Sequence, residues 1–203
     1  MTMKKYSGFT MIELLVAIAI AAIVVAVGVP ELRSFVQKGQ IITVTNELLA
    51  SFHVARSEAI RQNASACVCP SDSANDPVPA CSGANTWETG WIAFLDLNGN
   101  CVIEAGAPGD VLLKVWDGSK YGDQLTVRNN NASITTTNTV VFNSRGEPRM
   151  NGLSQQGTFS ICDDRPIAVD VNGNSMTASA VILGVSGQAR STRNATLITY
   201  TAP

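Results

Sequence analysis

The hydrophobic and polar positions divide the chain into three stretches with different patterns. From Phe9 to Val29 the chain is almost wholly apolar, and Glu13 is the single charged residue among these 21 positions. From Glu31 to about Asn63, apolar or small residues recur at helical spacing, at Ile41, Leu48, Phe52, Ala55 and Ala59. From Cys67 onward, short segments rich in β-branched and aromatic residues alternate with Gly, Asn, Asp and Pro.

The first stretch predicts a membrane-spanning helix. A helix over these 21 residues would be about 31 Å long, which matches the hydrocarbon core of a bilayer. Lys4 and Lys5 precede it and no comparable cluster follows, so the N-terminus should stay in the cytoplasm and the rest be exported. A secretory signal peptide has a shorter apolar core followed by its cleavage site. A buried core helix is disfavoured by the length of the run.

The second stretch predicts an amphipathic helix with one apolar stripe, from which Glu47, Ser51, Glu58 and Arg61 are largely excluded. No proline interrupts residues 31–63. We therefore expect one long helix, with its first half in the membrane and its second half packed on a sheet.

The third stretch predicts a mainly antiparallel sheet, and the fold class is α+β. Polar loops are expected at Ser71–Thr86 and Arg128–Asn138. The expected strands are Gly90–Asp96, Val111–Trp116, Thr139–Asn143, Thr158–Cys162, Ala178–Val185 and Ala195–Tyr200.

Glu13 is the residue of the apolar stretch that most needs an explanation. An ionised carboxylate in a bilayer costs roughly 3 kcal/mol even on lenient insertion scales, so such a residue is a functional hypothesis by default. A buried charge is tolerated when an opposite charge pairs with it. We therefore expect Glu13 to have a cationic partner.

The segment Gly8-Phe9-Thr10-Met11-Ile12-Glu13, after a short basic leader, resembles the class III signal of type IV pilins and type II secretion pseudopilins. The resemblance implies that prepilin peptidase cleaves between Gly8 and Phe9 and that the new amine of Phe9 is methylated. It also implies that Glu13 pairs with the Phe9 amine of a neighbouring subunit in a filament. Pro30 stands where such pilins often carry a helix-kinking proline.

Later segments resemble the GspH/FimT (FimU) group of minor pilins and pseudopilins. They are "LLASFHVARSEAI" (48–60), "CVCPS" with Cys81, "WETGWIAFLDLNGN" (87–100), "FSICDDR" and "VSGQAR". The resemblance implies a pseudopilus subunit of type II secretion or, alternatively, a FimT/FimU-like subunit of a type IV pilus. The implied partners are other pilin subunits, prepilin peptidase and the inner membrane.

The implied organisation has four parts. Residues 1–8 are the prepilin leader, 9–29 the transmembrane and filament-core helix, 30–63 the amphipathic helix, and 64–203 a periplasmic β-rich domain. The chain would cross the inner membrane once. Removing Lys4 and Lys5 with the leader leaves 12 basic and 16 acidic side chains, or a net charge of −4.

The five cysteines, Cys67, Cys69, Cys81, Cys101 and Cys162, are expected to face the periplasm, where disulfides persist. Cys69 and Cys81 flank the proline-containing loop and are the best pair. Cys162 could pair with Cys67 or with Cys101, and either choice leaves one thiol over, because spacing alone does not fix connectivity.

No metal or cofactor is expected. Cys67-Val68-Cys69 is a CxC pair without a matching second pair. Asp96, Asn98, Asn100 and Glu104 have the spacing of early calcium ligands, but the glycine expected after Asn100 and the final glutamate of such a loop are missing. Asn98-Gly99 is more simply read as a type I′ hairpin turn.

Neither catalysis nor tight nucleic-acid binding is expected. His53 is the single histidine, and no nucleophile elbow accompanies it. FimT-type pilins that take part in DNA uptake resemble one another in a C-terminal Gly-Arg-x-Arg motif. Here Gln188 replaces the first arginine, while Arg190 and Arg193 remain. Each lost phosphate contact weakens binding, so binding should be weak or undetectable at physiological salt.

Overall fold

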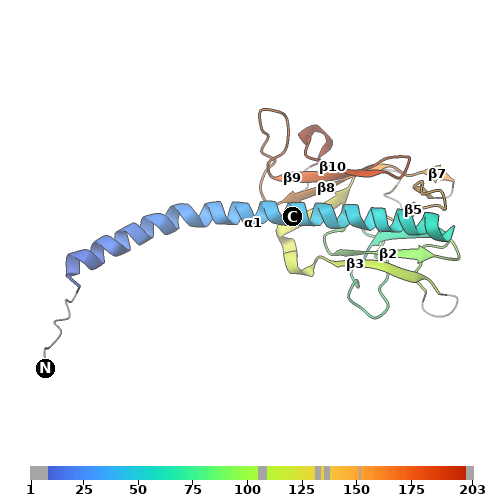
Figure 1. The fold of residues 1–203 in the computed structure, drawn as a ribbon, viewed down its shortest axis with the longest axis horizontal. Helices are drawn as coiled ribbons and strands as arrows, with labels where there is room; N and C mark the ends of the chain where they lie inside the picture. The colour runs from blue at the N-terminus through green and yellow to red at the C-terminus, as the bar shows by residue number, and fades with distance from the viewer. Residues whose placement is uncertain (1–8, 105–108, 131–133, 135–137, 151, 200–203) are drawn as a thin grey trace, which may run out of the picture. The chain divides into compact units, whose positions relative to one another are not determined.

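The computed structural model describes residues 9–104, 109–130, 134, 138–150 and 152–199, apart from the side chains of residues 123 and 150. Two compact units, Met1–Gly39 and Gln40–Pro203, are treated separately below. Helix α1 (Met11–Gln62) belongs to both units and continues through Pro30 (Figure 1). The expected long helix is therefore confirmed, and its end lies within one residue of the prediction.

The first sheet of the globular unit has four antiparallel strands in the order β3-β2-β1-β5. Their bounds are β1 (Ser65–Pro70), β2 (Gly90–Asp96), β3 (Val111–Asp117) and β5 (Val140–Phe142). β2 is buried along its whole length because it lies inside the sheet and carries Trp91, Ile92, Phe94 and Leu95.

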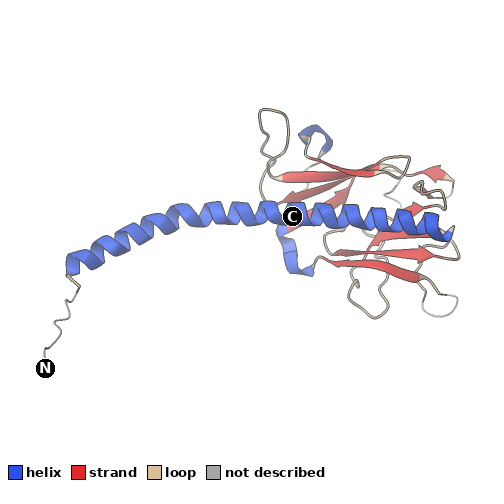
Figure 2. Cartoon of the chain, viewed as in Figure 1, coloured by secondary structure: helices blue, strands red, loops and turns tan. Residues whose placement is uncertain are grey.

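The second sheet has the order β10-β9-β8-β4 and is also antiparallel (Figure 2). Its strands are β4 (Leu125–Asn129), β8 (Gly157–Asp163), β9 (Ala178–Leu183) and β10 (Ala189–Thr192). The short strands β6 (Arg149–Met150) and β7 (Leu153–Ser154) form a separate hairpin. Two 3-10 helices, η1 (Ser119–Gln124) and η2 (Ala195–Leu197), complete the described elements.

The apolar stripe expected on the second half of the helix is confirmed. Its members are all buried: Ile41, Leu48, Phe52, Ala55 and Ala59, together with Val44. The Phe52 ring contacts Trp87, Phe142 of β5 and Phe159 of β8, with ring centroids 6.4, 6.3 and 5.1 Å away. One helical side chain thus joins strands of both sheets into a single core.

Ser51 departs from the expected pattern, because it is buried rather than lying off the stripe. Its hydroxyl donates to the Glu47 carbonyl oxygen at 2.8 Å and accepts from the indole nitrogen of Trp91 at 2.8 Å. A buried indole N–H needs an acceptor. Ser51 supplies it at a position that hydrophobic spacing alone assigns to the surface.

The strand expected at residues 195–200 is wrong for its described part. Ala195–Leu197 is the 3-10 helix η2, capped by Asn194, whose side-chain oxygen accepts from the Thr196 amide. Residues 200–203 lie outside the described residues. None of the expected strands covers β1, β4, β6, β7 or β10, and β4 overlaps the start of the loop expected from residue 128.

Candidate functional site: the N-terminal segment and its neighbours in the sequence pattern

Thr10 defines the start of helix α1. Its hydroxyl oxygen accepts from the Glu13 amide at 3.3 Å, and its carbonyl oxygen accepts from the Leu14 amide at 3.2 Å. Thr-x-x-Glu at a helix start is the sequence of a capping box. Thr10 stands three residues before Glu13, so this cap could have been predicted from the sequence.

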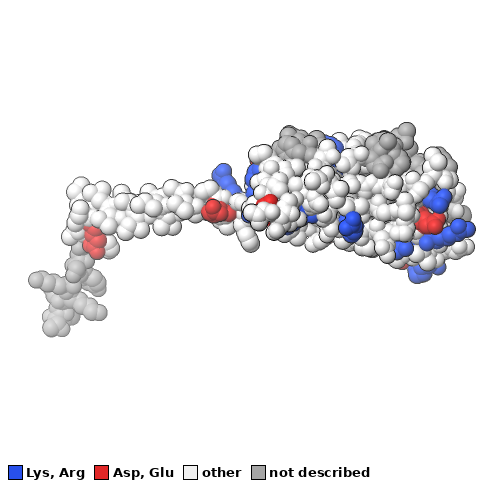
Figure 3. Space-filling model, turned by 90° about the horizontal axis from the view of Figure 1, so that it is seen from above, with Lys and Arg blue, Asp and Glu red and all other residues white. Residues whose placement is uncertain are grey.

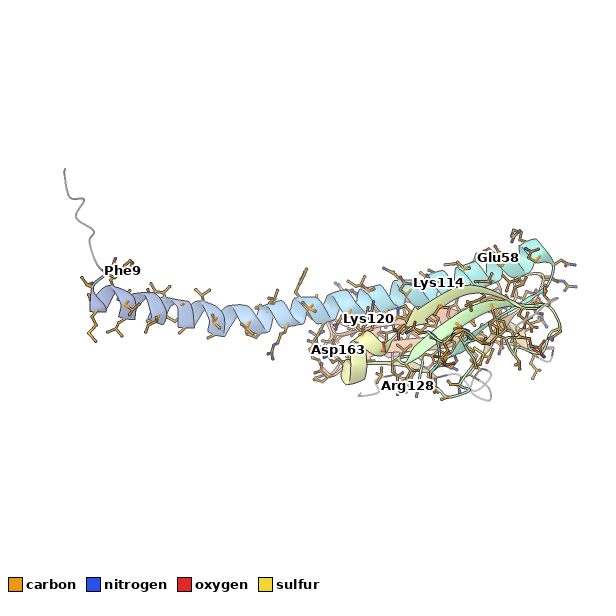
Figure 4. The ribbon with its side chains drawn as sticks, turned by 90° about the horizontal axis from the view of Figure 1, so that it is seen from below. Phe9, Glu58, Lys114, Lys120, Arg128 and Asp163 are labelled. Atoms are coloured by element: carbon orange, nitrogen blue, oxygen red, sulfur yellow. A yellow bond between two sulfur atoms is a disulfide. The ribbon has the colours of Figure 1, made fainter. Side chains whose placement is uncertain are left out.

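Glu13 therefore has a local structural role at the start of α1, besides the intermolecular role that is predicted for it. A carboxylate in the first turn interacts favourably with the positive end of the helix dipole. Among the described residues no ion pair uses Glu13, so an intermolecular partner stays a prediction. Phe9 and Glu13 are both exposed (Figure 4 labels Phe9), while Gly8 lies outside the described residues.

The N-terminal unit presents an apolar surface along the helix. Phe9 is 78% exposed, and the helix has a window of 18 residues with mean hydropathy 2.9, none of which is buried. Within the described part of the chain, α1 is the one helix long and apolar enough to cross a membrane. A free apolar surface of this size needs either lipid or other helices to cover it.

Two disulfides fasten loops of the first sheet to β1. Cys69 is joined to Cys81 as expected, with their Cα atoms 5.5 Å apart. The second pair differs from both alternatives considered, because Cys67 is joined to Cys101, with Cα atoms 5.8 Å apart. Cys162 is buried on β8 and belongs to neither disulfide, and its sulfur lies 4.0 Å from the Thr199 carbonyl oxygen. Cys67 and Cys69 share one face of β1, since they are two residues apart on a strand.

Peptide mapping without reductant should recover Cys69 linked to Cys81 and Cys67 linked to Cys101, because each pair is held by the strand and loop that carry it. Closing the shorter loop contributes about 3 kcal/mol in the chain-entropy model. A peptide containing Cys162 should be alkylated only after unfolding, since the residue is buried. Recovery of Cys162 in a disulfide would contradict this connectivity.

The Asp96 carboxylate holds the turn formed by residues 96–101 after β2. The two Asp96 carboxylate oxygens accept from the amides of Gly99 at 2.8 Å and Cys101 at 2.9 Å. The ligand atoms of Cys67, Asp96 and Cys101 lie within 4.8 Å of one another, but the disulfide uses both sulfurs. The expected two-residue hairpin at Asn98-Gly99 is wrong, because β3 begins only at Val111.

The C-terminal segment considered for DNA binding forms a hairpin turn. Gly187 has φ +76° and lies between β9 and β10, and the Gln188 carbonyl oxygen accepts from the Gly184 amide at 2.9 Å. Arg190 lies on β10 and Arg193 follows it, and both are exposed. The backbone conformation of the turn therefore explains the glycine at position 187 without a ligand.

Residues 3–29 match the prokaryotic N-terminal methylation motif, and residues 44–187 match the family described as type II transport protein GspH. The second match covers most of the chain. This chain therefore belongs to the GspH family, and the resemblance to the GspH/FimU group of pilin-like proteins is confirmed.

Two solved structures are similar to this chain, and the first supports the shared fold. The type IV minor pilin FimU of Pseudomonas aeruginosa in one crystal form has a TM-score of 0.51 and 17% identity, covering 77% of this chain and 90% of that one. In a second crystal form the TM-score is 0.45 at 17% identity, with 73% and 90% covered. No curated protein sequence matches this chain. The expected α+β pilin-like fold is confirmed.

The family assignment defines the role at a coarse level. The chain is a minor pilin or pseudopilin, a class of structural subunits that are processed by prepilin peptidase and assemble with other pilins. Such subunits are anchored by the apolar N-terminal helix and carry a soluble C-terminal domain. Families of this class are not enzymes.

Proposed function

We propose that this chain is a minor subunit of a type II secretion pseudopilus. Residues 1–8 are a leader, residues 9–29 span the inner membrane, and residues 30–63 continue the helix into the periplasmic domain of residues 64–203. The description of the matching family supports this assignment. The observation that carries it is the exposed apolar surface of α1 with a single carboxylate, Glu13, in its first turn.

Assembly then depends on the amine that cleavage after Gly8 creates on Phe9. Methylation keeps the positive charge of that amine. Inside a filament, the Glu13 carboxylate of one subunit neutralises the Phe9 amine of a neighbour, so that neither charge is buried alone. Because one carboxylate meets one amine, the pair sets the register of adjacent helices while the apolar surfaces supply the packing.

Glu13→Ala should abolish incorporation into the filament while leaving cleavage intact. The paired charge is lost, and the neighbour's amine is left buried without a partner, at a cost of several kcal/mol. Incorporation is measured by the recovery of this chain in sheared or detergent-extracted filaments. Mass spectrometry should find Phe9 as the first residue of both the unaltered chain and the variant.

Glu13→Gln separates the two roles of this residue. Glutamine can replace glutamate in a capping box but carries no charge. Failure of both variants to assemble supports the intermolecular ion pair. Normal assembly of Glu13→Gln, with loss only in Glu13→Ala, would instead assign Glu13 to capping. Normal assembly of Glu13→Ala would sink the proposal for this residue.

A type IV pilus is the competing destination, because its minor pilins have the same fold. Deleting the chain in its own host and measuring protein export and pilus-dependent movement in parallel distinguishes the two. We expect export to be lost and movement to be retained. Loss of movement with normal export would place the chain in a type IV pilus.

A further inference from the structure

Two carboxylates of the globular unit are buried among the described residues, those of Asp96 and Asp163, and each residue is 1% exposed. Figure 3 shows other acidic side chains on the surface of this unit, where water solvates them. Asp163 forms an ion pair with Arg165. No ion pair in the described part of the chain uses Asp96. A buried charge without a cation is costly, so the position of Asp96 needs an explanation.

The Asp96 carboxylate is held by backbone amides instead of a cation. One oxygen accepts from the Gly99 amide at 2.8 Å, and the other, Oδ2, accepts from the Cys101 amide at 2.9 Å. Hydrogen bonds from backbone amides to a carboxylate anion are charge-assisted and stronger than those between neutral groups. The turn after β2 therefore fixes both the place and the orientation of this carboxylate.

The same carboxylate lies against the disulfide between Cys67 and Cys101. Its Oδ2 atom, which accepts from the Cys101 amide, is 3.6 Å from the Sγ atom of Cys67. The Cys67 sulfur carries no proton while it is bonded to Cys101, so this is a close contact and not a hydrogen bond. One carboxylate oxygen thus lies beside both halves of the disulfide.

The two halves of this disulfide differ in their access to solvent. Cys67 is completely buried on β1, whereas Cys101 is partly exposed. A thiolate from solution can therefore reach the sulfur of Cys101 but not that of Cys67. Its lone pair forms a new bond to Cys101 Sγ, the bond between the two Sγ atoms breaks, and the electron pair of that bond leaves on Cys67. The products are a mixed disulfide on Cys101 and a thiolate on Cys67, which then takes a proton from solvent.

We propose that Asp96 protects the Cys67–Cys101 disulfide against attack by thiols, because it places a negative charge beside the sulfur that has to leave. The Cys67 thiolate would form 3.6 Å from the carboxylate oxygen, and like charges at this distance in a buried site disfavour each other. Thiol–disulfide exchange is slow when the leaving sulfur is a poor leaving group. This protection does not depend on the filament in which the chain works, so the assembly tests stand separately.

The second disulfide supplies an internal reference. Cys69 is also completely buried on β1, and its partner Cys81 is also partly exposed. Cys67 and Cys69 belong to one apolar cluster, so both leaving sulfurs have similar surroundings. Among the described residues, no hydrogen bond joins the Cys69 sulfur to a carboxylate. A thiolate that attacks Cys81 therefore expels Cys69 without creating a pair of like charges.

The test measures the reduction of the two disulfides in the folded full-length chain, in mild detergent with excess glutathione as the attacking thiol. Samples are quenched with acid and alkylated, and their peptides are mapped by mass spectrometry. Asp96→Asn removes the charge and keeps the size of the side chain. It should raise the initial rate of reduction of Cys67–Cys101 about tenfold and leave that of Cys69–Cys81 unchanged. In the unaltered chain and in the variant, glutathione should be found on Cys101 and not on Cys67.

Gly99→Ala is the matched control for a loosened turn. Gly99 has φ +82° and no atom lies within 4 Å of the added carbon, so this variant strains the turn but keeps the carboxylate. It should leave the rate for Cys67–Cys101 unchanged. The proposal is overturned if Asp96→Asn has no effect on this rate or if Gly99→Ala raises it equally. Glutathione on Cys67 of Asp96→Asn would also overturn it, because the turn would then have opened.

The unaltered chain gives a further measurement that needs no variant to fold. It should lose the Cys69–Cys81 disulfide before the Cys67–Cys101 disulfide, since only the second has a carboxylate beside its leaving sulfur. The reverse order would contradict the protective role of Asp96.

Discussion

Gly187→Ala should lower the free energy of unfolding of the globular unit by about 3 kcal/mol. An L-residue at φ +76° costs about 1 to 2 kcal/mol. In addition, a β-carbon at this position would lie 1.9 Å from the Gly146 carbonyl oxygen and 2.8 Å from the Arg56 Nε, and overpacking of this kind costs about 1 to 3 kcal/mol. Arg56 joins the turns at Gly146 and Gly187, because its guanidinium donates to the carbonyl oxygens of Gly146 and Ser186. The substitution therefore pushes these two turns apart.

Tryptophan fluorescence of the full chain in mild detergent measures this effect, because Trp87, Trp91 and Trp116 all lie in the globular unit. We expect the midpoint of thermal unfolding to fall by about 10 °C. Gly173→Ala is the matched control, since its φ is +78° and no atom lies within 4 Å of the added carbon. It should cost only about 1 kcal/mol. Equal losses in the two variants would show that the turns do not contact each other.

Phe52→Ala should cost the globular unit about 4 kcal/mol. The ring is 1% exposed and packs against Phe142 of the first sheet, Phe159 of the second sheet and Trp87, which precedes β2. Its removal leaves a cavity that a helix held by strands on both sides cannot close. The same fluorescence measurement should show a loss of midpoint larger than that of Gly187→Ala.

Phe35→Ala is the control for this prediction, because Phe35 lies on the same helix but is 74% exposed in the N-terminal unit. It should leave the unfolding midpoint unchanged. A small effect of Phe52→Ala, comparable with that of the control, would contradict the assignment of Phe52 as the residue that joins the two sheets.

Hydrophobic periodicity was sufficient to predict the helix and most long strands, because both depend on which positions face the core. It was insufficient where side-chain caps or strand pairing, rather than burial, determine the local structure. Residues 195–197 form a 3-10 helix because the Asn194 side chain caps the local amide of Thr196. β10, with the sequence ARST, has almost no apolar pattern and is a strand because it pairs with β9.

The candidate site could be predicted from sequence in part. The motif that contains Phe9 and Glu13 is recognisable from its residues and agrees with the match over residues 3–29, while the ion pair of Glu13 stays a prediction. The cap from Thr10 was not predicted, although the Thr-x-x-Glu spacing encodes it. The second disulfide was missed for a different reason. The pairing of Cys67 with Cys101 depends on the turn after β2, which brings Cys101 back beside β1, and neither cysteine spacing nor composition encodes that turn.

The nested disulfides have a consequence for oxidation during export. Cys67 and Cys69 precede Cys81 and Cys101, so under the proposed topology they reach the oxidising compartment first. An oxidase that joins cysteines in order of arrival would link Cys67 to Cys69 and Cys81 to Cys101, whereas the structure links the first to the fourth and the second to the third. The yield of native subunit should therefore depend on disulfide isomerisation as well as on oxidation.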